Sequence, residues 1–139
     1  MPSVEFLADT SVFARLSKPV VAARFAPLAA TARVGICAPV AFEIGYSARS
    51  HHDFVAVTER LGSFPSLPVT DGDHHRALDV QASLAGRGQQ RALSLVDALV
   101  AAVAEARGLR VLHYDSDFEL VAEVTGQPHE WIVPRGTAD

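Results

Sequence analysis

The sequence predicts an α/β fold in which helices cover both faces of a mostly parallel central sheet. Three observations support this prediction. Short apolar runs alternate along the chain with longer helical patterns, the order that builds parallel sheets. The 139 residues are the length of one domain, and a hydrophobic share of 49% with 20% charged residues is typical of a globular protein. We therefore expect one domain over residues 1–139, without repeats or linkers.

Five short apolar runs are the predicted strands. The first stops abruptly at the polar segment that begins with Asp9, as expected for a buried strand that delivers polar side chains at its carboxyl end. Pro68 cannot donate a hydrogen bond within a central ladder, so the third run is predicted to be an edge strand. The predicted strands cover residues 4–8, 33–38, 66–69, 110–114 and 130–133.

Seven helices are predicted around these strands. Pro19 stands in a first helical turn, where proline is tolerated, and Asp53 and Ser94 are the predicted N-caps of two later helices. Gly62 and Gly108 are placed where helices end. The second helix is predicted to bury a loosely spaced set of apolar residues, Val20, Ala23, Phe25 and Leu28. The predicted helices cover residues 11–16, 19–32, 39–49, 54–61, 71–86, 94–107 and 116–125.

Composition and charge limit the classes of function. The formal net charge is −4, so nucleic acid would have to be bound by local cationic patches or through a metal ion, not by a general positive field. The lone Cys37 cannot form an internal disulfide and is expected in the core. The first residues, with Glu5 and Asp9 beside only a few apolar side chains, predict neither a signal peptide nor a membrane span. We therefore expect a cytoplasmic protein.

Four acidic residues far apart in the sequence are candidates for one site. Asp9 and Asp115 each follow a predicted strand, whereas Glu43 and Asp97 lie in apolar helices. Each also has a purely structural explanation: Asp9 and Asp115 as N-caps, Asp97 as a capping-box partner of Ser94, and Glu43 on a solvated helix face. Asp97 fits its structural explanation least well, because its sequence neighbours are apolar and an unpaired buried charge is costly.

Taken together, the four carboxylates predict a metal site. Ligands of open α/β sheets bind at the carboxyl ends of the strands. The mutual repulsion of such a cluster is relieved most simply by a hard divalent cation bound through oxygen. Carboxylates and the Ser11 hydroxyl suit Mg²⁺ or Mn²⁺, and no Cys/His spacing suggests zinc. The chemistry that suits such a site is metal-assisted hydrolysis of a phosphodiester bond.

The order of these acidic positions resembles that of the PIN-domain nucleases. Asp-Thr-Ser follows the first strand, Glu43 precedes Tyr46 by three residues, Ser-x-x-Asp-Ala opens an alanine-rich helix, and Asp-x-Asp-Phe follows a later strand. Within that family the chain is most similar to the VapC-type toxins of bacterial toxin–antitoxin pairs, from Val4 to about Val133. The resemblance implies a three-layer α/β/α PIN-like domain and a Mg²⁺- or Mn²⁺-dependent endoribonuclease.

The resemblance also implies roles for individual residues. It implies that four carboxylates bind the metal and take part in catalysis, those of Asp9, Glu43, Asp97 and Asp115. Ser11 is implied to be a supporting ligand or a hydrogen-bond donor. Asp117 is a further possible metal ligand, since the Asp-Ser-Asp segment offers two carboxylates.

The implied partners are RNA, a VapB-like antitoxin and a second copy of the chain. In the family, the C-terminal segment of the antitoxin lies across the acidic groove and often offers an arginine to it. RNA phosphates are expected to contact some of the cationic side chains, although each of these is individually well explained as a solvated surface charge. The candidates are Arg15, Lys18, Arg49, Arg87 and Arg91, with His51, His52 and His113 if they are protonated.

Two other classes of function can be compared with the residues: a phosphotransfer domain, which the residues disfavour, and a non-catalytic interaction module. An aspartate-based phosphatase of the haloacid-dehalogenase type would need a second Asp two residues after Asp9, where this chain has Ser11. A receiver domain would need a lysine late in the sheet, but Lys18 is the only lysine. A non-catalytic interaction module would use the carboxylates only as caps and core partners, and it would bind no metal through Asp97.

Overall fold

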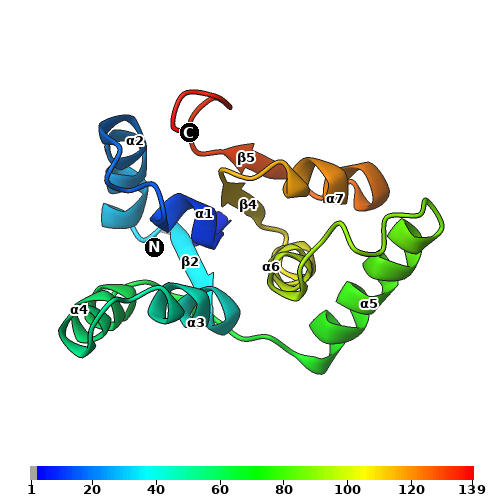
Figure 1. Ribbon diagram of the computed structural model, residues 1–139, viewed down its shortest axis with the longest axis horizontal. Helices are drawn as coiled ribbons and strands as arrows, with labels where there is room; N and C mark the ends of the chain where they lie inside the picture. The colour runs from blue at the N-terminus through cyan, green and yellow to red at the C-terminus, as the bar shows by residue number, and fades with distance from the viewer. Residues whose placement is uncertain (1–2) are drawn as a thin grey trace.

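The computed structural model describes residues 3–139 and has a five-stranded sheet at its centre (Figure 1). The strand order is β3-β2-β1-β4-β5, and each neighbouring pair is parallel. The predicted parallel α/β architecture is therefore confirmed, with β3 at an edge as Pro68 indicated. The strands are β1 (Phe6–Ala8), β2 (Val34–Cys37), β3 (Ser66–Leu67), β4 (Arg110–His113) and β5 (His129–Trp131).

Seven helices connect the strands within residues 3–139. They are α1 (Thr10–Phe13), α2 (Pro19–Ala30), α3 (Ala38–Tyr46), α4 (His51–Leu61), α5 (Asp71–Ala85), α6 (Leu95–Ala106) and α7 (Asp117–Thr125). None of the helices in this part of the chain combines the length and the apolar character that a membrane span requires.

Alternate residues of the strands face two separate apolar layers, so the fold has three layers. Leu7 of β1 packs in the core beneath α3, α6 and α7. Phe6 and Ala8 of the same strand pack in the core beneath α1 and α2, which the C-terminal segment also joins through Ala138. Cys37 is buried in the first of these cores, as predicted.

Two local predictions about the helices were wrong. The N-cap of α4 is Ser50, not Asp53, because the Ser50 side chain accepts the hydrogen bond from the Asp53 N–H and the helix begins three residues earlier than predicted. The buried face of α2 is formed by Val21, Phe25 and Leu28, at the spacing of one helical stripe, whereas Val20 is 51% exposed. Ala23 is also exposed.

Helix α6 is apolar on nearly every face because it is covered on both sides. Residues 98–104 of this helix are all buried. The sheet side of α6 belongs to the same core as β1 and β4, and Ala98 and Leu99 pack with Ala77 of α5 on the other side. Figure 1 shows α6 nearly end-on, with α5 on its outer side. The first turn of α6, which carries Asp97, is thereby held against the sheet.

Candidate metal centre

Two adjacent parallel strands deliver acidic residues to the same edge of the sheet. β1 and β4 pair in register from Phe6 to Ala8, and the Asp9 N–H continues this pairing by donating to the Leu112 carbonyl over 2.9 Å. Asp9 directly follows β1, and Asp115 lies just beyond the end of β4. Parallel strands point the same way, so the two carboxylates reach the carboxyl edge together.

The first turn of α6 adds a third carboxylate. Asp9, Asp97 and Asp115 each offer an oxygen, and these three oxygens lie within 4.8 Å of one another. Asp9 is 2% exposed, and the other two are half-buried. Asp117, in the first turn of α7, is close enough to Asp97 to help raise the pKa of that carboxyl, and it stands at the margin of this group. We call Asp9, Asp97 and Asp115 the three-carboxylate cluster.

Asp9 acts as a helix cap and as a member of the cluster at the same time. Its Oδ2 accepts hydrogen bonds from the backbone N–H of Ser11 (3.1 Å) and from the Ser11 hydroxyl (2.6 Å), which caps α1. Its Oδ1 is buried and has no hydrogen-bond partner within residues 3–139. A buried carboxylate oxygen without a partner is costly, so a bound cation would satisfy a need that the protein leaves open.

Ser11 ties the ends of β1 and β4 together. Its hydroxyl donates to Asp9 and accepts a hydrogen bond from the Tyr114 N–H over 2.9 Å. Because the hydroxyl donates its proton in the hydrogen bond to Asp9, Ser11 orients the Asp9 carboxylate through Oδ2.

Two hydrogen bonds hold Asp115, one at its side chain and one at its backbone N–H. Its Oδ1 accepts a hydrogen bond from the Asp117 N–H at the start of α7 (2.9 Å), and its own N–H donates to His113 Nδ1 (3.1 Å). Because Nδ1 of His113 is an acceptor, its Nε2 carries the proton and donates to His129 Nδ1, 2.8 Å away. The N-cap of α7 is Ser116, not Asp115, but Asp115 accepts a backbone hydrogen bond at the start of that helix and belongs to the cluster at the same time.

His113 is not a phosphate contact, contrary to the expectation from the sequence. The side chain is fully buried and packs between Phe118 and Trp131. Burial, and secondarily the neighbouring His129, lower the pKa of His113 to about 3. The ring is therefore neutral at physiological pH and out of reach of a substrate.

Glu43 lies beside the cluster but outside the group of three. It projects from α3, and its Oε1 accepts a hydrogen bond from the Thr10 hydroxyl over 2.6 Å. Thr10 is the first residue of α1 and directly follows Asp9. Sequence reasoning did not single out Thr10, although its place in the Asp-Thr-Ser segment was the available signal.

Electrostatics make this edge of the sheet favourable for a cation. Burial raises the pKa of Asp9 despite its hydrogen bonds to Ser11. The pKa of Asp97 rises to about 8, mainly through burial, then through the charge of Asp9, the hydrogen bond with Asp117 and the charge of Asp115. Oxygen-only donors, mutual repulsion and the unpartnered Oδ1 of Asp9 together fit a hard divalent cation.

The four arginines predicted to contact RNA are differently placed. Arg15 lines a pocket that also contains Asp115. Arg87 forms a 2.7 Å ion pair with Glu123 of α7. Arg49 and Arg91 are exposed.

Comparisons with known proteins agree with the fold. The family model of the PIN domain matches residues 6–124. The chain is 44% identical to Ribonuclease VapC51 of Mycobacterium tuberculosis, an alignment that covers 99% of each chain. It is 40% identical to Ribonuclease VapC18 of the same organism, over 95% of this chain and 98% of the relative.

Solved structures show the same fold. A DNA-bound VapBC from Salmonella typhimurium superposes with a TM-score of 0.76 and 22% identity, over 94% of this chain and 99% of that one. VapBC-5 from Mycobacterium tuberculosis superposes with a TM-score of 0.62 and 25% identity, over 94% and 97%. The family match spans most of the chain, and two relatives matched over nearly their full length are 44% and 40% identical to it. This chain belongs to the PIN domain family, in which it groups with the VapC ribonucleases.

Proposed function

We propose that this protein is a metal-dependent endoribonuclease that acts as the toxin of a VapBC-type toxin–antitoxin pair. The observation that carries the proposal is the three-carboxylate cluster, with its unpartnered buried oxygen, in a chain similar over its whole length to a ribonuclease. Its RNA substrate makes the cytoplasm the proposed location.

Asp9, Asp97 and Asp115 are the proposed ligands of Mg²⁺ or Mn²⁺, with Asp117 and Glu43 at the margin of the site. When bound, the cation would supply Lewis-acid activation of water and would stabilise charge on the leaving oxygen. The Ser11 hydroxyl and the Asp117 N–H donate hydrogen bonds to the carboxylates of Asp9 and Asp115 and so orient two of these ligands.

The protein's own groups also control protons in this site. Asp97, with its pKa raised to about 8, must release its proton to become a ligand, so metal binding should tighten as the pH rises. Glu43 Oε1 accepts a hydrogen bond from the Thr10 hydroxyl, which leaves Oε2 to accept a hydrogen bond from a water molecule. We propose that Glu43 in this way orients the attacking water.

Cleavage assays test the proposed activity. RNA should be cut with Mg²⁺ or Mn²⁺ and not with EDTA, and Asp9→Asn should be inactive while remaining folded. Asp71→Asn is the matched control, because Asp71 is an exposed acidic residue in the first turn of another helix. Undiminished cleavage in EDTA would rule out the metal mechanism.

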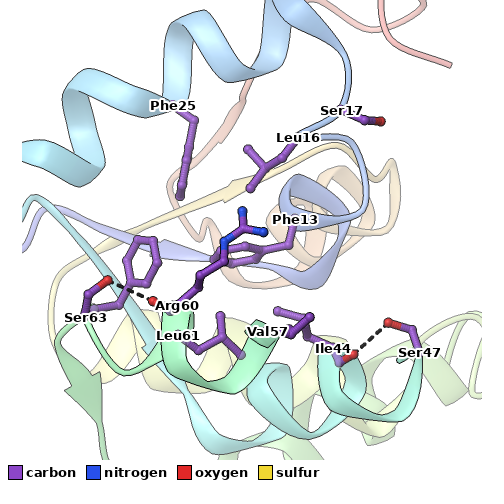
Figure 2. Close-up of a pocket in the computed structure, with 11 residues that line it drawn as sticks. Phe13, Leu16, Ser17, Phe25, Ile44, Ser47, Val57, Arg60, Leu61 and Ser63 are labelled. Atoms are coloured by element: carbon purple, nitrogen blue, oxygen red, sulfur yellow. Dashed lines mark hydrogen bonds between the residues drawn. The ribbon is translucent and has the colours of Figure 1, made fainter. Parts of the chain in front are cut away.

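An apolar groove supports the proposed antitoxin partner. It has a volume of about 670 Å³ and lies between the α1–α2 segment and helices α3 and α4. Figure 2 shows Leu16 and Phe25 on one side, Val57 and Leu61 on the other, and the Arg60 side chain reaching between them. Such a groove suits the apolar face of a partner helix, while the acidic cluster would accept an arginine from the same partner.

Co-purification tests the partner assignment. Leu16→Asp, which puts a charge into the groove, should release a co-expressed VapB-like antitoxin without reducing RNA cleavage by the free protein. Retention of the antitoxin by this variant would place its binding site elsewhere. We also propose a homodimer, for which the exposed Phe42 (75%) and Tyr46 (85%) of α3 are candidate contacts, and light scattering of the free protein checks it.

A further inference from the structure

An open pocket of about 370 Å³ adjoins the candidate metal centre. It shares Ser11 and Asp115 with that centre, and its other walls include Arg15, Arg135 and Ser116. These residues come from α1 and its following turn, from the β4–α7 connection and from the segment after β5. The pocket is thus assembled from distant parts of the chain at the carboxyl edge of the sheet.

Arg15 is held in this pocket by uncharged partners. Its Nε donates to the Ala138 carbonyl and its Nη1 to the Ser11 carbonyl, both over 3.2 Å. The guanidinium lies 4.5 Å from the centroid of the Tyr114 ring. Both acceptors are neutral, and Arg15 forms no salt bridge among the described residues. Its orientation is therefore set before any anion arrives.

Arg135 is a second cation in the same pocket. Its side chain is 65% exposed and lies 5.7 Å from the centroid of the Trp131 ring. Its distance of 3.7 Å from Glu119 makes only a loose surface ion pair, which a phosphate can replace at little cost. Several other arginines make closer pairs, such as Arg76 with Glu105 at 2.7 Å.

An RNA substrate needs cations at this position. Phosphates must approach an acidic centre in a protein of net charge −4, so neighbouring phosphates are repelled unless local positive groups receive them. Guanidinium groups match phosphate oxygens in geometry and charge. We propose that Arg15 and Arg135 bind the phosphodiester group next to the cleaved bond, on the Asp115 side of the centre. This inference rests on the proposed ribonuclease function and names a contact for its substrate.

Asp139 places a negative charge in the same pocket. Its Oδ1 accepts a hydrogen bond from the Tyr114 hydroxyl over 2.7 Å, and it lines the same pocket. A carboxylate there opposes the binding of a phosphate. Asp139→Asn keeps an oxygen acceptor for Tyr114 but removes the charge, so it should tighten RNA binding.

The test is binding of a short fluorescein-labelled single-stranded RNA of randomised sequence, by anisotropy in EDTA at several KCl concentrations. Randomised RNA is suitable because phosphate contacts carry no sequence information. Arg135→Gln and Arg15→Gln should each weaken binding about fivefold or more and reduce the slope of log K against log [KCl] by about 0.7. Arg15→Lys should retain most of the slope, which separates loss of charge from loss of packing.

Arg110→Gln is the matched control. Arg110 is exposed and stands at the start of β4, at the opposite edge of the sheet from the centre. The Arg110→Gln variant should bind RNA like the wild type. If Arg135→Gln leaves both affinity and slope unchanged while the wild type binds and cleaves RNA, the pocket is not a phosphate site and the proposed function stands. A wild type that neither binds nor cleaves RNA would overturn both.

Discussion

Replacing Asp97 by asparagine should stabilise the metal-free protein and abolish its response to metal. In the wild type, burial and then the charge of Asp9 raise the pKa of Asp97 from 3.8 to about 8. Between these two values, the folded protein holds a proton that the unfolded chain releases. The free energy of unfolding of the metal-free protein therefore falls as the pH rises through this window.

The magnitude of the Asp97 effect follows from the pKa difference. One pKa unit corresponds to about 1.4 kcal/mol, and pH 7 lies about three units above the ordinary value. Because Asp97 is only half-buried, solvent screens part of this interaction, and we expect about 2 kcal/mol at pH 7. Asparagine has nearly the same shape, does not ionise in either state and can donate a hydrogen bond to Asp117. In a chain of this length, the gain would raise the melting temperature by about 6–8 °C.

Thermal unfolding by circular dichroism, from about pH 5 to about pH 8, measures the effect of Asp97→Asn. In EDTA the variant should melt above the wild type, by a margin that grows with pH. In saturating Mn²⁺ the order should reverse, because only the wild type gains the free energy of metal binding. Asp71→Asn, in the first turn of α5, serves as the control and should show neither effect. If Asp97→Asn melted more than about 5 °C below the wild type in EDTA at pH 7, the reasoning would be refuted and Asp97 would belong to a structural network.

Three further predictions concern the residues around the cluster. Asp115→Asn should lower single-turnover RNA cleavage at saturating Mn²⁺ by at least about 100-fold, whereas Asp117→Asn should mainly cost roughly 0.5–1 kcal/mol of stability; the opposite pattern would exchange their roles. Thr10→Val removes the hydrogen bond to Glu43 and should lower kcat about 10-fold without loss of fold; an unchanged kcat would exclude Thr10 from the site. Because the pKa of His113 lies at about 3, below the usual 6.5, the stability this residue contributes is present above pH 6.5 and is lost as the pH falls toward 3. Between pH 6.5 and pH 5, the free energy of unfolding in urea should fall by about 2 kcal/mol more for the wild type than for His113→Phe. A difference between the two proteins that does not change with pH would contradict this prediction.

Local chemistry explains which structural predictions succeeded. A buried strand, a proline in a first turn or a serine cap depends on neighbours within a few residues, so the parallel sheet and the Ser94 cap of α6 were readable from the sequence. Where two local solutions compete, the sequence alone does not choose between them. Ser50 and Asp53 are both good caps, and only the geometry of the helix end selected Ser50.

Part of the candidate site could be predicted because its carboxylates stand among apolar residues in the sequence. Asp97 stands out as a carboxylate in an apolar helix, and Asp9 and Asp115 stand out at the ends of apolar runs. Taken alone, Asp9 and Asp115 were each explained as a helix cap, and Asp97 less well. In the structure Asp9 does cap α1, whereas the N-cap of α7 is Ser116 and Asp115 accepts a hydrogen bond from the Asp117 N–H at the start of that helix. The sequence therefore determined the fold class, the family and the set of acidic residues that could share a site.

Only the tertiary structure decided which of these groups meet. The convergence of three carboxylates depends on the register of β1 and β4 and on the position of α6 against them. The bond from Thr10 to Glu43 joins α1 to α3, and the pocket beside the centre joins Arg15 to Arg135 across most of the chain. His113 is buried because β4 is an inner strand covered on both faces. Such contacts are set by the packing of whole elements against one another, which no short stretch of sequence encodes by itself.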